Sequence, residues 1–173
     1  MISMQDKLDD VSFKELLGYS IEGEKAAHKA YLELSKKISG LPSDRFKSLA
    51  KDELKHKERL IKLHEDEFED EEYVVPEGKE LPPHEGSLID IDPDKVKVLT
   101  QAVGAAIEAE KDAYRIYKHL AKKSEKHSDL FNYIAMMEKG HKESLEGEKN
   151  IWEDHEKKKG KETSLSEIDL WGF

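Results

Sequence analysis

The stretch FKSLAKDELKHKERL, residues 46–60, returns in altered form as FNYIAMMEKGHKESL, residues 131–145. In both copies apolar residues recur at alternating spacings of three and four, which predicts a helix with one side facing a core. On that side the first copy carries Glu53 three residues before His56, and the second copy repeats the pair. An acid and an imidazole therefore recur one turn apart, where an ordinary bundle helix would bury two apolar residues.

A second pair of stretches repeats in the same order. IEGEKAAHKAY, residues 21–31, matches IEAEKDAYRIY, residues 107–117, and places Glu24 opposite Glu110 in the alignment. Each of these stretches comes before one copy of the Glu–His stretch. The chain is therefore predicted to be a duplicated pair of helices.

The four predicted helices have helix-start residues in the places where the apolar pattern begins. A Ser or Asp at such a position accepts hydrogen bonds from free backbone N–H groups, and a Pro is tolerated in the first turn. The predicted start residues are Ser12 with Glu15, Ser43, Asp92 before Pro93, and Ser128.

A long connection separates the second and third predicted helices. Residues 68–93 hold four of the five prolines and show no helical period. About 20 extended residues reach roughly 65 Å, which exceeds the ~40 Å length of a 25-residue helix. The chain can thus return along the whole bundle, which predicts an all-α four-helix bundle with one crossover and ferritin-like connectivity. We expect the bundle to occupy residues 1–158, followed by a flexible or docking tail at 159–173.

Six ionisable residues lie on the core-facing sides of these helices. Burying carboxylates without compensation costs several kcal/mol each, whereas two divalent cations balance four carboxylates. Carboxylate oxygen and imidazole nitrogen suit iron or manganese, and six side chains leave room on two metals for oxygen, peroxide or water. The predicted metal ligands are Glu24, Glu53, His56, Glu110, Glu138 and His141.

The composition excludes other kinds of site. The chain has 173 residues, no Cys and a formal net charge of −10. Without Cys there is no disulfide, Cys-ligated zinc or iron–sulfur cluster within it. A net acidic surface without a basic stripe argues against nucleic acid as a partner. The N-terminal MISMQDKLDD lacks the features of a signal peptide, and no apolar run is long enough for a membrane span, so we expect a cytoplasmic protein.

The motifs IEGEKAAHKAY, DELKH, IEAEKDAY and MEKGH resemble the rubrerythrin-type branch of the ferritin-like superfamily, over about residues 12–155. The resemblance implies two iron ions, with manganese or mixed metals as the alternative. It implies that Glu53 and Glu138 bridge the metals, while Glu24, Glu110, His56 and His141 are terminal ligands. The activities of the family are hydrogen peroxide reduction, oxygen-linked oxidation of ferrous iron, and iron storage.

Two features depart from the family pattern. Rubrerythrins carry a Cys-ligated rubredoxin domain that supplies electrons, and this chain has no Cys. They also carry a second Glu three residues after the ligand on the third helix, where this chain has Ala113, with Ala27 as its repeat equivalent. An external electron donor such as a rubredoxin is therefore expected.

Other polar residues near the predicted site each admit more than one interpretation. Tyr31 and Tyr117 hydrogen-bond to the ligands, take part in electron transfer, or fill the core. His28 is an extra ligand, a proton relay or a surface histidine, and Tyr114 holds the equivalent place. No catalytic residue is assigned beyond these candidates.

The tail KKKGKETSLSEIDLWGF ends in an apolar group that could dock on its own bundle, on a neighbouring subunit or on a partner protein. Its apolar members are Leu165, Ile168, Leu170, Trp171 and Phe173. We expect a homo-oligomer, a dimer or larger.

The sequence thus predicts a di-iron oxidoreductase that reduces hydrogen peroxide or oxygen, with a role in oxidative stress. The alternative is a ferroxidase or iron-binding protein for iron storage or detoxification.

Overall fold

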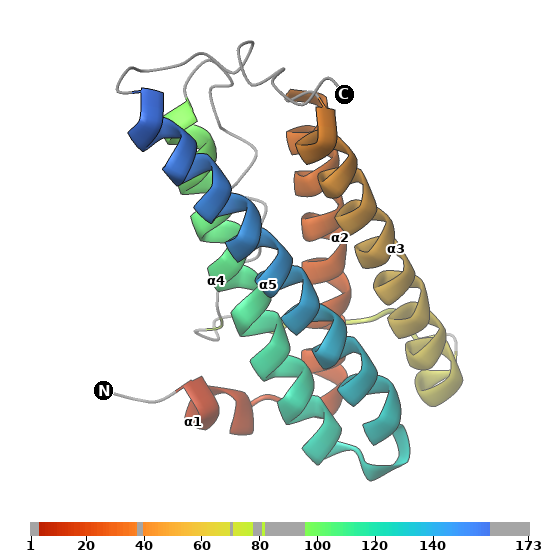
Figure 1. The fold of residues 1–173 in the computed structure, drawn as a ribbon. Coiled ribbons are helices and arrows are strands. Elements are labelled where there is room, and N and C mark those ends of the chain that lie inside the picture. Colours follow the sequence, from red (N-terminus) through yellow and green to blue (C-terminus); the bar gives the residue numbers. More distant parts are fainter. Residues whose placement is uncertain (1–3, 38–39, 70, 78–80, 82–95, 160–173) are drawn as a thin grey trace.

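The computed structural model describes residues 4–37, 40–69, 71–77, 81 and 96–159. Four long helices form the bundle that the sequence predicts (Figure 1). These helices are α2 (Phe13–Lys37), α3 (Gly40–Phe68), α4 (Val96–Lys123) and α5 (Ser128–Lys159). A short helix, α1 (Met4–Asp9), precedes α2, and a 3-10 turn, η2 (Glu125–His127), lies between α4 and α5. The described part of the chain has no strand, which confirms the all-α prediction.

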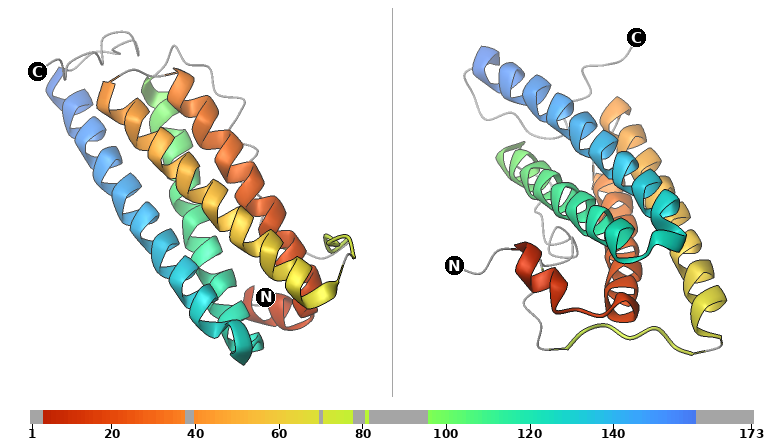
Figure 2. Two further views of the ribbon diagram at one scale, coloured as in Figure 1. Left: turned by 90° about the vertical axis from the view of Figure 1, so that its right-hand side faces the viewer. Right: turned by 90° about the horizontal axis from the view of Figure 1, so that it is seen from below.

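The helices pair as two hairpins, α2 with α3 and α4 with α5, which lie side by side (Figures 1 and 2). The end of α3 and the start of α4 lie at opposite ends of the bundle, as the predicted long crossover requires. None of the helices in the described ranges is long and apolar enough to cross a membrane.

The start of α2 follows its sequence closely. The backbone N–H of Ser12 donates to Glu15 Oε2 at 3.0 Å, and the N–H of Glu15 donates to Ser12 Oγ at 3.2 Å. This reciprocal pair is the predicted capping box, and it satisfies two N–H groups at the helix start. At the turn into α3, Gly40 has φ of +71°, a backbone angle that favours glycine.

Two other predicted helix starts are wrong. The second helix begins at Gly40, before Ser43, and the hydroxyl of Ser43 instead donates to the carbonyl oxygen of Ser35 at 2.7 Å. Ser43 therefore ties the end of α2 to the start of α3. Ser128 already has helical angles, φ −54° and ψ −41°, so it is the first residue of α5 and not its cap.

Some predictions concern residues outside the ranges that the structure describes. The start residues Asp92 and Pro93 lie outside the described residues. So does the predicted tail, except for Lys159, which ends α5.

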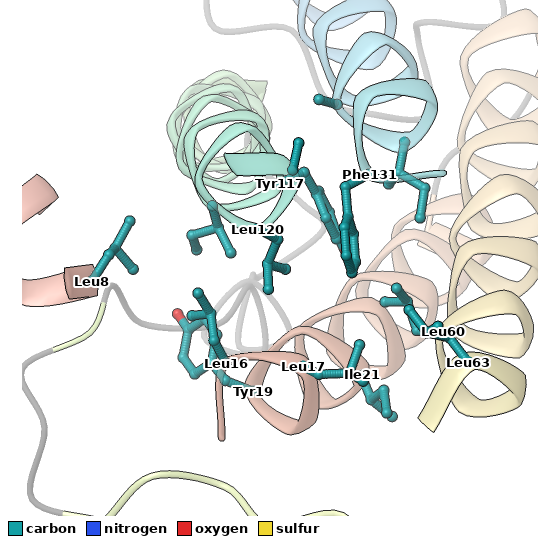
Figure 3. Close-up of a cluster of buried hydrophobic side chains, with 14 of the residues drawn as sticks. Leu8, Leu16, Leu17, Tyr19, Ile21, Leu60, Leu63, Tyr117, Leu120 and Phe131 are labelled. Carbon is teal, nitrogen blue, oxygen red and sulfur yellow. The ribbon is translucent and has the colours of Figure 1, made fainter. Parts of the chain in front are cut away.

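Two apolar clusters fill the bundle, one on each side of a polar layer. The Tyr31 cluster includes Tyr31, Leu34, Phe46, Leu49, Val103, Leu145 and Trp152. The Tyr117 cluster, drawn in Figure 3, includes Leu8, Leu16, Leu17, Leu60, Tyr117, Leu120 and Phe131. On α3, Ala50 belongs to the first cluster and Leu60 to the second, and Glu53 and His56 lie between them. The predicted metal ligands thus form a buried layer between two apolar regions.

The first part of the crossover packs on α2. A side chain at Gly18 would collide with the backbone of Val74, so this close approach requires glycine. Beside it, the Tyr73 hydroxyl donates to Glu22 Oε1 at 2.5 Å. These contacts set the path of the chain as it leaves α3.

The short helix α1 was not predicted from the sequence. Its Leu8 is buried in the Tyr117 cluster, and Lys123 on α4 donates to the carbonyl oxygens of Leu8 and Val11 at 3.1 and 2.6 Å. A helix this short has little intrinsic stability. It forms here because these tertiary contacts hold it.

Candidate metal centre

The structure brings the six predicted metal ligands together in the middle of the bundle. Each long helix contributes: α2 supplies one Glu, α4 supplies one Glu, and α3 and α5 each supply a Glu and a His one turn later. All six residues are buried, with none more than 5 % exposed. The residues are Glu24, Glu53, His56, Glu110, Glu138 and His141.

The six residues form two overlapping groups. In each group the ligand atoms lie within 4.8 Å of one another, as a metal ion would require. One group contains Glu24 and His56, and the other contains Glu110 and His141. Both groups contain Glu53 and Glu138, which are therefore shared.

The distances follow this division. His56 Nδ1 lies 2.9 Å from Glu138 Oε1, 3.2 Å from Glu53 Oε2 and 3.5 Å from Glu24 Oε2. Each carboxylate of the group thus approaches one imidazole nitrogen. Glu53 and Glu138 also face the other imidazole, whereas Glu24 does not.

The second group mirrors the first. His141 Nδ1 lies 2.9 Å from Glu53 Oε1, 3.4 Å from Glu138 Oε2 and 3.7 Å from Glu110 Oε2. The two imidazole rings are stacked, with centroids 5.8 Å apart and planes at 25°. The arrangement has an approximate two-fold symmetry that follows the sequence repeat.

Several buried polar atoms of the cluster have no hydrogen-bond partner in the structure. They include Glu24 Oε2, Glu53 Oε1, Glu138 Oε1 and His141 Nδ1. His141 Nδ1 lies close to three carboxylate oxygens, yet none of these contacts has hydrogen-bond geometry. Carboxylate oxygens and imidazole nitrogens that lie close together without hydrogen-bond geometry fit ligands of a shared cation better than a hydrogen-bond network. The residues present therefore fit a pair of divalent ions.

Burial and mutual repulsion act on the two peripheral carboxyls. Burial raises the pKa of Glu24 well above its usual range, and the nearby charge of Glu138 adds to the shift. The same two causes raise the pKa of Glu110 to about 8. Both groups therefore hold a proton near neutral pH unless a cation replaces it.

The central residues shift toward their charged forms. Burial acts to raise the pKa of Glu53, but the close imidazoles of His141 and His56 outweigh it and the pKa falls. Burial acts to lower the pKa of His56, but the close carboxylates of Glu138, Glu24 and Glu53 raise it to about 12. Protons and cations thus compete for the same atoms, as expected of a carboxylate–imidazole metal site.

Two tyrosines contact the peripheral carboxyls across the bundle. The hydroxyl of Tyr31 on α2 donates to Glu110 on α4, and the hydroxyl of Tyr117 on α4 donates to Glu24 on α2. Their rings stack on Phe46 and Phe131 of the same hairpins, at interplanar angles of 29° and 18°. Each tyrosine therefore fills the core and also orients a carboxyl of the opposite hairpin.

The remaining candidates lie outside both groups. The half-buried His28 has Nδ1 2.6 Å from the carbonyl oxygen of Ala50, so it contacts the backbone of α3. Tyr114, also half-buried, packs against the Tyr117 cluster. Among the described residues, neither belongs to a group that could hold a metal.

The site also contains features that sequence reasoning missed. Asp52 Oδ2 lies 3.9 Å from His141 Nε2, on the side of the ring away from the carboxylates. A cavity between α2 and α4 reaches Glu24, Glu53, Glu110 and Glu138. Asp52 does not lie on the apolar seam, and its place beside Glu53 was the only indication of it. The cavity depends on helix spacing, which no sequence pattern records.

Comparisons with known proteins agree with this geometry. The chain matches the sequence profile of the rubrerythrin family over residues 15–149. A solved structure of a hypothetical protein from Pyrococcus furiosus is 30% identical, with a TM-score of 0.77 over 87% of this chain and 96% of that chain. The comparison with curated proteins found no match.

A second solved structure shares the fold. It is a protein from Thermotoga maritima, provisionally described as a ferritin-like diiron-carboxylate protein. It is 24% identical, with a TM-score of 0.67 over 81% of this chain and 95% of that chain. This likeness confirms the predicted ferritin-like fold.

Proposed function

Because the chain belongs to the rubrerythrin family, we propose that it is a di-iron oxidoreductase that reduces hydrogen peroxide or oxygen at a carboxylate-bridged dinuclear site. The observation that carries the proposal is the sharing of Glu53 and Glu138 between two ligand groups. Two separate metal sites would have no need of common carboxylates. A shared pair suits two ions held close enough to act on one small molecule.

Bound as a ferrous pair, the metals supply two electrons, which with two protons convert one hydrogen peroxide to two waters. The protein residues hold the ions and set their surroundings. Glu53 and Glu138, which belong to both groups, would bridge the two ions, and each imidazole with its peripheral carboxyl would hold one of them. Two apolar clusters exclude water on either side along the bundle axis.

The tyrosines position the peripheral carboxyls in this proposal. A carboxyl has two oxygens, and the tyrosine hydroxyl occupies Oε1 of Glu24 and of Glu110. The other oxygen, Oε2, is the one that lies near the imidazole in both groups. The hydrogen bond thus aims a single oxygen at the metal position, which keeps room for the oxidant.

A second candidate function is ferroxidation for iron storage or detoxification. The observation that favours it is the lack of Cys, which leaves these 173 residues without an iron–sulfur or rubredoxin-type centre of their own. A peroxidase must be reduced again after each cycle, so it needs an external one-electron donor such as a rubredoxin. A ferroxidase is supplied with electrons by each incoming ferrous ion.

Three further parts of the proposal come from the sequence. We place the protein in the cytoplasm and expect a homo-oligomer, and we place the redox partner at the bundle surface, within electron-transfer distance of the buried site. The identity of the metals as iron, and not manganese, is also part of the proposal. The carboxylate–imidazole set suits either ion.

The test is a mixing experiment on anaerobic protein loaded with ferrous iron. Peroxide or oxygen is added first, followed by excess ferrous iron. Rapid single oxidation by peroxide, with little further iron consumed, supports the oxidoreductase. Sustained oxidation of many ferrous ions per site, with mineral accumulating, supports iron storage instead.

A further inference from the structure

The cavity between α2 and α4 connects the buried cluster with the outside of the bundle. Its inner wall is formed by the four carboxyls of the site. Its lining also includes four small, half-buried or buried residues, Gly23, Ala27, Ala109 and Ala113, beside larger ones such as Tyr19 and Ile116. Gly23 and Ala109 are equivalent in the repeat, as are Ala27 and Ala113, so both helices are narrow at the same level.

Buried polar atoms without hydrogen-bond partners belong to the residues at the inner end. Glu24, Glu53 and Glu138 are all buried. Each has one carboxyl oxygen without a hydrogen-bond partner: Oε2 of Glu24, and Oε1 of Glu53 and of Glu138. All three residues line the cavity. The cavity therefore leads to polar atoms that can receive a ligand, and not to an apolar end.

Side chains block the cluster in other directions. The stacked imidazoles of His56 and His141, whose side chains are 3 % and 7 % exposed, lie on the α3 and α5 side. Along the bundle axis, the rings of Tyr31 and Tyr117 are fully or almost fully buried within the two apolar clusters. Between α2 and α4, in contrast, a cavity lined by described residues reaches the carboxyls of the site.

The size of the cavity limits what can enter. Its volume is about 60 Å³, whereas one water molecule needs about 10–15 Å³. A molecule of two heavy atoms therefore fits easily, and a bulkier molecule comes closer to the side chains of Ala27 and Ala113 that line the cavity. The four carboxyls and Asp112 make the lining acidic, which disfavours anions.

We propose that this cavity is the entry route for the oxidant and that Ala27 and Ala113 set its width, so that hydrogen peroxide or oxygen enters more readily than alkyl hydroperoxides. The inference rests on the proposed function, because it names the substrate class of that same site. Hydrogen peroxide and oxygen are both uncharged near neutral pH and have two heavy atoms each. They satisfy the charge and the size limits together.

The first experiment measures entry without turnover. Nitric oxide, a neutral two-atom probe, is mixed with ferrous-loaded protein, and its association is followed by stopped-flow absorption. The double variant Ala27→Leu/Ala113→Leu should bind nitric oxide about tenfold more slowly or worse, because added side chains fill the route and packed helices yield little. Metal content and circular dichroism should match the unaltered protein.

The matched control adds the same bulk elsewhere on α4. Ala105 is exposed and does not line the cavity, so Ala105→Leu should leave nitric oxide association unchanged. If the double variant keeps its metals and binds nitric oxide at the original rate, the cavity is not the route. This result would overturn the inference even if peroxide reduction were demonstrated.

The second experiment widens the route, which keeps the inference testable if the leucine variants fail to fold. Ferrous protein is oxidised with hydrogen peroxide or with tert-butyl hydroperoxide. The unaltered protein should react much faster with hydrogen peroxide, and Ala113→Gly should narrow that difference by speeding only the bulkier oxidant. An unchanged ratio in Ala113→Gly would overturn the role of Ala113. If neither oxidant reacts while nitric oxide still enters by this route, the proposed activity fails and the entry route stands.

Discussion

The two helix hairpins are alike at their shared interface and differ just outside it. Both supply a peripheral Glu, a tyrosine seven residues later, a phenylalanine that stacks on that tyrosine, and a Glu–His pair. The hydrogen bonds of the tyrosines are reciprocal, each crossing to the other hairpin. The ligand positions and their orienting groups thus form one symmetric unit that neither hairpin can complete alone.

The differences begin one residue away from the ligands. Asp52 on α3 lies near His141, but the repeat equivalent of Asp52 is Met137, which offers no carboxylate to His56. His28 contacts the α3 backbone, whereas its equivalent, Tyr114, packs on apolar residues. The two metal positions therefore have the same ligand types but different surroundings, and they are expected to differ in affinity.

The largest effect should come from the residues that both halves share. Replacing Glu53 or Glu138 with Ala should reduce the binding of both metals, because each belongs to both ligand groups. Elemental analysis after metal loading would measure this. The exposed, repeat-equivalent pair Glu58 and Glu143 provides matched controls, for which Ala substitution should retain full loading. A Glu53→Ala protein that lost one metal and kept the other unchanged would contradict the bridging role.

The next largest effect should be the weakened binding of a single ion, when the His of one ligand group is replaced. His56→Ala removes a ligand from one group only, and His141→Ala removes its equivalent from the other. Each variant should bind one ion weakly and keep the second, which metal titration with spectroscopic detection would show. Simultaneous loss of both ions in either variant would mean that the halves are not separable in this way.

A smaller effect should follow from cutting the crossed hydrogen bonds. Tyr31→Phe and Tyr117→Phe each remove the hydroxyl that donates a hydrogen bond to a buried carboxyl. Each should lower the free energy of unfolding by about 1–3 kcal/mol, the usual cost of an unsatisfied buried polar group. Urea unfolding measures this, with Tyr133→Phe as the control, since Tyr133 is 47 % exposed. Unequal losses in the two variants would show that the two crossings are not equivalent.

The smallest effect should sharpen the difference between the two metal positions. Asp52→Asn removes the carboxylate near His141, at a distance of 3.9 Å that is too long for a direct hydrogen bond. The affinity for one ion should fall by less than about tenfold, the lower end of the effect of such partners. Asp44→Asn on the exposed side of the same helix is the control. Equal weakening of both ions would mean that Asp52 does not distinguish them.

The sequence predicted the features that have a period. The seam of each helix, the crossover and the grouping of the six ligands all follow from spacing and repetition. The prediction at Ser43 failed because its hydroxyl has a better partner, the Ser35 carbonyl in the neighbouring helix. A capping pattern cannot reveal such a competing acceptor.

Features that depend on pairs of distant residues could not be predicted. Tyr31 was a candidate partner of the site, but its acceptor is Glu110, 79 positions away on another helix. The docking of α1 through Leu8 and Lys123 is of the same kind. Each depends on how the hairpins are set against one another, which local sequence does not encode.

The most direct test of the dinuclear centre is the number of metal ions per chain. The unaltered protein would be loaded anaerobically with ferrous iron, freed of excess metal and measured by native mass spectrometry alongside elemental analysis. Four carboxylates that balance two divalent ions predict about two ions per chain at full loading. A single tightly held zinc ion, with no second metal bound under any loading condition, would contradict the dinuclear centre.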